Sequence, residues 1–145
     1  MAVLTHEHRV IFGDTDAMGI VYHGNYFRYF ELARGEWFRE FYKKPTDMVE
    51  AGHFLIVIAA HANYIYPARY DDVLQIEAWI PKDGIGRVQL RFEFEIFRRR
   101  DRKLLVDGYT THTWTDKNGK LKRLSKQMIA ELSDLTEDRR IENGE

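Results

Sequence analysis

The sequence has no cysteine, which excludes disulfide bonds, thiol nucleophiles and metal sites built from thiolates. It has no run of about 18 consecutive apolar residues, so no membrane span is expected. The N-terminal stretch has no apolar segment of signal-peptide length. Neither sign of charge dominates, because 22 Lys and Arg residues stand against 23 Asp and Glu residues. We therefore expect a cytoplasmic protein without a nucleic-acid partner.

What the chain does have is enough apolar material for a folded core. Its 145 residues are 44% hydrophobic and 14% aromatic, unlike the composition of a disordered chain. This length is typical of one domain. We find no internal repeat and no linker, and we expect a single folded unit.

One long helix is expected from about Gly24 to Tyr42. Its apolar residues recur at spacings of four, three, four and four, which is the helical period: Tyr26, Phe30, Ala33, Trp37 and Phe41. At about 1.5 Å per residue this helix spans roughly 28 Å, the width of a small domain. A helix so long and so aromatic needs a large apolar surface to cover it.

The remaining pattern predicts strands joined mainly by short turns. Alternation and β-favouring residues mark strands over 5–12, 54–66, 73–80, 87–97 and 103–115. Short helices are expected at 46–51, with Thr46 as a possible N-cap, and from Ser125 to about Leu132. Short connections make antiparallel neighbours. The expected fold class is therefore α+β, with a five-stranded antiparallel sheet curled around one central helix.

The strand expected at 54–66 is apolar on both faces, interrupted by His61 and Asn63 on one of them. A strand of this kind is buried on both sides, either inside its domain or against another subunit. One helix can cover only one face of the sheet. We therefore expect the protein to form a homo-oligomer.

The stretch between the first strand and the long helix carries the candidate chemistry. Residues 13–22 contain two glycines, Asp14 and Asp16, and they lead directly into the helix. The free N–H groups of a first helical turn can hold a developing negative charge. A nearby aspartate can attack a carbonyl or activate water, although it can equally cap the helix. Asp14 is interpreted as structural.

These residues resemble a known family. The run from Asp14 to Tyr26, DTDAMGIVYHGNY, followed by Tyr29-Phe30-Glu31, is similar to the hotdog-fold acyl-CoA thioesterases, the 4-hydroxybenzoyl-CoA and Tol–Pal-associated group. The segment from Pro67 to Leu74, PARYDDVL, fits as well. The resemblance implies one hotdog domain over 1–133, followed by a polar tail at 134–145 that we expect not to order itself. It also implies dimers with sheets joined edge to edge, and dimers of dimers, which are homotetramers.

The resemblance also implies roles for individual residues. Asp16 takes the catalytic position as nucleophile or general base, and the N–H of His23 polarises the thioester carbonyl. Tyr22, Gly24 and Tyr26 lie where they can border the acyl group. Lys82 and Arg87 are what remains here of a tighter basic cluster that contacts CoA phosphates, and Phe12 replaces a tyrosine of some relatives. No metal and no cofactor are implied; the substrate is an acyl-CoA or a thioester of an acyl-carrier protein.

Two other functions are compatible with the same residues. The fold could serve a hydratase or dehydratase acting on acyl thioesters, which usually pairs a histidine with an acid. It could also be a non-catalytic module that binds acyl-CoA or an acyl carrier. Release of free thiol separates hydrolysis from both alternatives.

Overall fold

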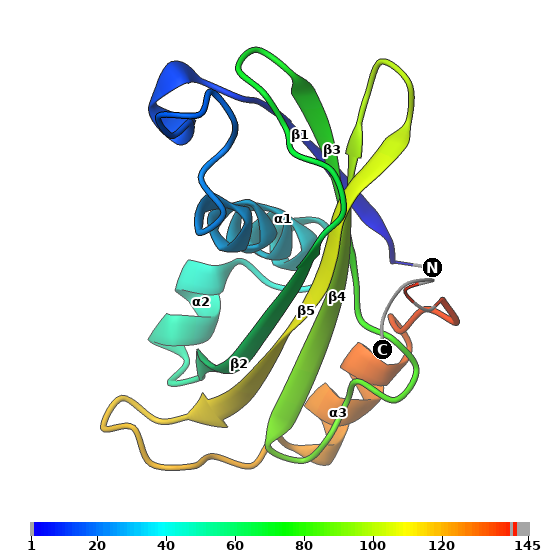
Figure 1. The fold of residues 1–145 in the computed structure, drawn as a ribbon. Helices are drawn as coiled ribbons and strands as arrows, with labels where there is room; N and C mark the ends of the chain where they lie inside the picture. Colours follow the sequence, from blue (N-terminus) through cyan, green and yellow to red (C-terminus); the bar gives the residue numbers. More distant parts are fainter. Residues whose placement is uncertain (1, 140, 142–145) are drawn as a thin grey trace.

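The computed structural model describes residues 2–139 and 141 and shows an antiparallel sheet curled around one helix (Figure 1). The strands follow the order β1-β3-β4-β5-β2, and all four neighbouring pairs are antiparallel. The strands are β1 (Leu4–Arg9), β2 (Phe54–Tyr64), β3 (Val73–Trp79), β4 (Gln89–Arg98) and β5 (Lys103–Thr115). The helices are η1 (Phe12–Asp14), α1 (Asn25–Phe41), α2 (Pro45–Glu50) and α3 (Lys126–Ser133). The predicted α+β architecture is confirmed.

The core lies between α1 and the concave face of the sheet. Four residues of the predicted stripe are buried, Tyr26, Phe30, Ala33 and Trp37, whereas the fifth, Phe41, is half-buried. Tyr29 and Phe38 of α1 are buried as well. The Phe30 ring stacks on Phe94 of β4, with centroids 4.4 Å apart. Gly108 of β5 lies beneath this contact, where an added Cβ would be 2.1 Å from the His61 carbonyl oxygen and 3.0 Å from the Phe30 ring. The helix and β2 approach β5 this closely because residue 108 has no side chain.

Several element boundaries differ from the sequence prediction. The first strand ends at Arg9 rather than at Phe12, because the N–H of Val10 bonds the Asp72 carbonyl and the chain then turns into η1. The second helix begins at Pro45 with Lys44 as N-cap, so Thr46 is not the cap. Proline is well suited to the first helical position because it lacks the N–H that would have no partner there. The predicted cap of the last helix is confirmed, since Ser125 Oγ accepts from the N–H of Met128 at 3.1 Å.

Strand β2 forms one edge of the sheet and is not buried within this chain. The side chains of Ile56, Val57 and Ile58 are 45%, 50% and 49% exposed. The pairing of β2 with β5 shifts register between Val57 and Ala59. Leu55 and Ala62 near the two ends of the strand pack against the core, but the described residues do not cover the apolar side chains in its middle.

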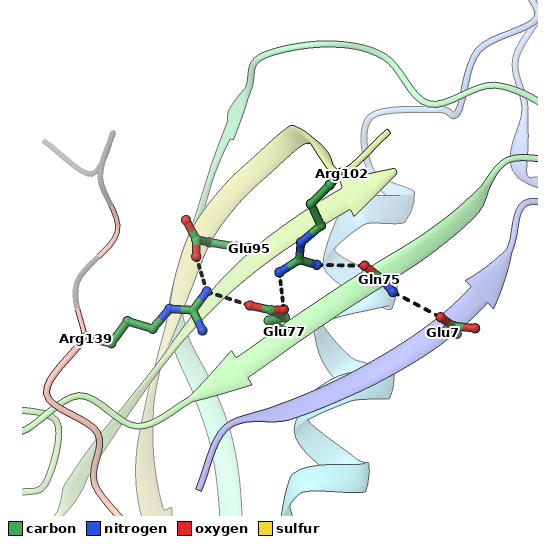
Figure 2. A network of polar contacts seen from close by, with 6 residues as sticks. All are labelled: Glu7, Gln75, Glu77, Glu95, Arg102 and Arg139. Atoms are coloured by element: carbon green, nitrogen blue, oxygen red, sulfur yellow. Dashed lines mark hydrogen bonds and ion pairs between the residues drawn. The ribbon is translucent and has the colours of Figure 1, made fainter. Parts of the chain in front are cut away.

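The convex face of the sheet carries buried carboxylates that the C-terminal segment covers (Figure 2). Arg139 pairs with Glu77 at 2.6 Å and with Glu95, and its guanidinium lies over the Trp79 ring. The N–H of Glu137 bonds the Ile80 carbonyl at 2.8 Å. Residues 134–139 thus pack on the sheet, contrary to the expectation from their polarity, because one arginine supplies the positive charge that two buried acids need. Residues 140 and 142–145 of the expected tail lie outside the described residues.

Candidate active site

The loop between η1 and α1 is a small hairpin. Thr15 and Val21 form an antiparallel bridge, and the N–H of Asp16 bonds the Ile20 carbonyl at 2.9 Å. Gly19 makes the turn at a φ of +79°, a conformation that glycine adopts without strain. Ile20 pairs in turn with Arg69 in the segment that precedes β3. The hairpin is therefore fixed to the body of the protein beside the start of α1.

Asp16 lies on this hairpin with a partly exposed side chain. Its Oδ1 accepts from the N–H of Met18 at 2.9 Å. Within residues 2–139 and 141, Oδ2 makes no hydrogen bond. One oxygen thus orients the carboxylate while the other is available to a substrate or a water molecule.

The start of α1 presents unpaired donors. Gly24 is the N-cap and has no side chain to bond the first turn. The N–H of Asn25 is taken by the Tyr22 carbonyl at 2.9 Å, whereas the N–H groups of His23 and Gly24 find no acceptor among the described residues. These two groups lie at the positive end of the helix dipole and can stabilise a negative oxygen.

A hollow of about 210 Å³ opens beside these donors. It is largely apolar and lined by Ile20, Val21, His23, Tyr26, Tyr64, Ile65, Tyr66 and Pro67. The Tyr64 hydroxyl donates to the His23 carbonyl at 3.1 Å, and the N–H of Ala68 donates to the Tyr26 hydroxyl at 3.1 Å. Burial raises the pKa of Tyr26, so its phenol stays neutral. The residues that line this hollow can hold an acyl group next to the start of α1.

The structure brings most of the predicted site residues together. His23 and Tyr26 line the hollow, and the ring of Tyr22 stacks at a tilt on the His23 ring with centroids 4.5 Å apart. An added Cβ on Gly24 would be 2.8 Å from the Tyr22 ring, so glycine permits this packing. Asp16 lies on the first strand of the hairpin, and the second strand of the hairpin contributes Ile20 and Val21 to the lining of the hollow.

Lys82 and Arg87 do not join this group within one copy of the chain. They lie in the connection between β3 and β4, where the Arg87 carbonyl accepts from the N–H of Leu124 just before α3. The Asp16 hairpin is attached at the other end of β3, through Arg69 (Figure 1). The two loops are therefore separated by the length of the strand.

Sequence reasoning missed the contact between Tyr64 and the start of α1. Tyr64 was assigned only to the apolar pattern of its strand, and no local signal shows that its hydroxyl reaches the start of α1. The contacts of Asp14 agree with its structural interpretation, since it holds several segments around the hairpin at once. His8 of β1 is one of its partners, with Nε2 3.0 Å from Asp14 Oδ2.

A larger hollow of about 350 Å³ lies elsewhere, between α1, α2 and the start of β2. It contains Arg34 and His53, and neither Asp16 nor the start of α1 belongs to its lining. We therefore place the candidate site at the smaller hollow. In the described part of the chain, no three His, Asp or Glu side chains converge as metal ligands. None of the described helices has the length and apolar character to cross a membrane.

Comparison with known proteins gives concordant matches. Residues 10–134 match the thioesterase-like superfamily. The acyl-CoA thioesterase YbgC of Haemophilus influenzae is 37% identical over 91 residues, which cover 62% of this chain and 65% of that protein. A hypothetical protein of Aquifex aeolicus has a TM-score of 0.80 and 32% identity, covering 89% of this chain and 98% of that one. The fold is also that of a 4-hydroxybenzoyl-CoA thioesterase, with a TM-score of 0.80, 23% identity, and 92% and 100% coverage.

Proposed function

We propose that this chain, which belongs to the thioesterase-like superfamily and has the hotdog fold, is an acyl-CoA thioester hydrolase in which Asp16 and the start of α1 perform the hydrolysis. The observation that carries this proposal is that one short hairpin holds the Asp16 carboxylate and leads into two unpaired N–H groups, those of His23 and Gly24, at the start of α1. Hydrolysis needs both parts, because an oxyanion forms while an oxygen nucleophile attacks.

The reaction assigns one task to each part. The thioester carbonyl oxygen accepts from the N–H groups of His23 and Gly24, and one such donor typically lowers the barrier by about 3–4 kcal/mol. Asp16 either takes a proton from the attacking water or attacks the carbonyl carbon itself. In the second route the resulting anhydride is then opened by water. In both, the C–S bond breaks, and the thiolate leaves readily because a thiol has a pKa of about 8.5.

We further propose that the working form is an edge-to-edge dimer joined through β2, and that two dimers assemble into a tetramer. The exposed apolar side chains of β2 and its unpaired edge support this form. The hollow is lined by Tyr64, Ile65 and Tyr66 at the end of the same strand, so a second copy would enclose it. Antiparallel pairing also reverses the second sheet, which brings that copy's Lys82 and Arg87 toward the substrate's CoA phosphates. An acyl-CoA substrate is consistent with a cytoplasmic location.

The test is free thiol release from a panel of short, long and aryl acyl-CoAs, together with an acyl-carrier thioester. Asp16→Asn keeps the shape of the side chain but removes its negative charge. We expect kcat to fall by at least about 100-fold, the range of a general acid–base contribution, with an unchanged melting temperature. Asp116→Asn is a matched control in the turn after β5, away from the hairpin, and should leave kcat unchanged. An Asp16→Asn protein that folds and hydrolyses as fast as wild type would refute the assignment.

A further inference from the structure

Asp14 sits at the base of the hairpin and gathers three donors onto one carboxylate oxygen. Its Oδ2 accepts from His8 Nε2 at 3.0 Å, from the Tyr29 hydroxyl at 2.9 Å and from the N–H of Ile11 at 3.1 Å. These donors come from β1, from α1 and from the segment that enters η1. One oxygen thus ties three separate segments together.

The backbone carbonyl of Asp14 holds two further donors. It accepts from the N–H of Tyr22 at 2.9 Å and from Asn25 Nδ2 at 2.8 Å. Tyr22 closes the hairpin, and Asn25 is the first residue of α1. Asp14 is therefore the common partner of both ends of the hairpin and of the helix start.

The surroundings keep this group ionised and fixed. The Asp14 side chain is only 16% exposed, and the His8 ring packs against the Tyr29 ring with centroids 4.8 Å apart. Burial alone would raise the pKa of Asp14, but the hydrogen bonds from His8, Ile11 and Tyr29 outweigh it and lower the pKa. A carboxylate can only accept hydrogen bonds, so all three donors are satisfied by the charged form.

We infer that Asp14 is a positioning residue that sets the distance between the Asp16 carboxylate and the N–H groups of His23 and Gly24. This inference rests on the proposed function. Asp16 follows Asp14 by two residues, and His23 directly follows the Tyr22 N–H that Asp14 holds. Both reacting groups are thus only one or two residues from atoms bonded to Asp14. Misplacement by about 1 Å can cost as much as 100-fold in rate.

The test compares Asp14→Ala, Asp14→Asn and Tyr29→Phe in thiol-release kinetics. Asp14→Ala should lower kcat by about 10–100-fold while KM changes little. The relative placement of the reacting groups is lost, whereas the residues that line the hollow and bind the substrate stay in place. Asp14→Asn keeps one acceptor oxygen at the same place and should recover part of kcat. Tyr29→Phe removes a single donor, and we expect a fall of about 2–10-fold, the equivalent of one net hydrogen bond.

The control is Asp116→Ala, which also removes a carboxylate that accepts two backbone N–H groups, at 2.8 and 3.0 Å, in a remote turn. It should lower the melting temperature without lowering kcat. Equal kcat losses in Asp14→Ala and Asp116→Ala, or an unchanged kcat in Asp14→Ala, would overturn the inference.

Hydrogen–deuterium exchange separates this inference from the proposed function. Asp14→Ala should speed amide exchange across residues 14–24 but not in β4. Wild-type protein that releases no thiol refutes the proposed function alone. In that case, faster amide exchange across residues 14–24 in Asp14→Ala still supports the positioning role, and unchanged exchange across these residues contradicts it.

Discussion

Replacing Gly108 by alanine should separate the edge strand from the sheet. The new Cβ would lie 2.1 Å from the His61 carbonyl oxygen, and real Cβ contacts below 3.0 Å are essentially never seen. The strand β2 must therefore move by about 1 Å, while the Phe30 ring blocks the opposite side at 3.0 Å. Overpacking of this kind costs about 3 kcal/mol. For a chain of this size that corresponds to a fall in melting temperature of roughly 6–12 °C.

The same substitution at Gly35 provides a control of opposite sign. Its Cβ would meet only the end of the flexible Arg39 side chain, at 3.2 Å. Alanine inside a helix is more stable than glycine by about 1 kcal/mol, so Gly35→Ala should raise the melting temperature by roughly 2–4 °C. Differential scanning calorimetry measures both. A Gly108→Ala protein that melts within about 2 °C of wild type would refute the close-packing argument.

Two further predictions concern the convex face and the wall of the hollow. Burial alone would raise the pKa of Glu77, but Arg102 and Arg139 outweigh it and lower the pKa below 4.5. The stabilisation from these pairs is therefore complete above pH 4.5 and is lost as pH falls through the lowered pKa. Arg139 also pairs with Glu95, whose pKa is raised by burial. Arg139→Gln should therefore cost about 1–3 kcal/mol at pH 7 in urea unfolding and progressively less as pH falls and first Glu95 and then Glu77 is protonated; an equal cost at every pH would contradict the ion-pair account. Tyr64→Phe removes the hydrogen bond to the His23 carbonyl and should lower kcat by about 2–10-fold; kinetics unchanged from wild type would exclude Tyr64 from positioning the helix start.

Local periodicity explains why much of the fold was predictable from the sequence. The stripe through Tyr26, Phe30, Ala33 and Trp37 depends only on spacing along one helix, and all four residues are buried against the sheet. The alternation over β4 likewise reports which side chains join the apolar core, namely Leu90, Phe92, Phe94 and Ile96. It does not report that Glu93 and Glu95 on the other face are buried as well. The motif around Asp16 marked this stretch as the candidate site because two acids, a glycine and a helix start follow one another directly, but it did not predict the hairpin that the stretch forms.

Features that depend on contacts between distant segments were not predictable in this way. Asp14 holds His8 and Tyr29 only because β1 and α1 meet in three dimensions. Arg139 stabilises a segment whose composition alone suggests no packed structure, because its partners Glu77 and Glu95 become neighbours only when β3 and β4 pair. The distance of Lys82 and Arg87 from the hairpin follows from strand direction, which single-residue patterns do not report.

The register shift at Val57–Ala59 has a consequence for how newly made chains associate. An exposed apolar edge can add any strand that offers free backbone groups, so a freshly folded copy is at risk of aberrant association. A bulge bends and twists the strand locally, and only a partner with matching curvature can extend the sheet past it. In the proposed dimer, the irregularity in β2 would favour pairing with a second copy of the same chain, which carries the same bend, over open-ended stacking of unrelated strands.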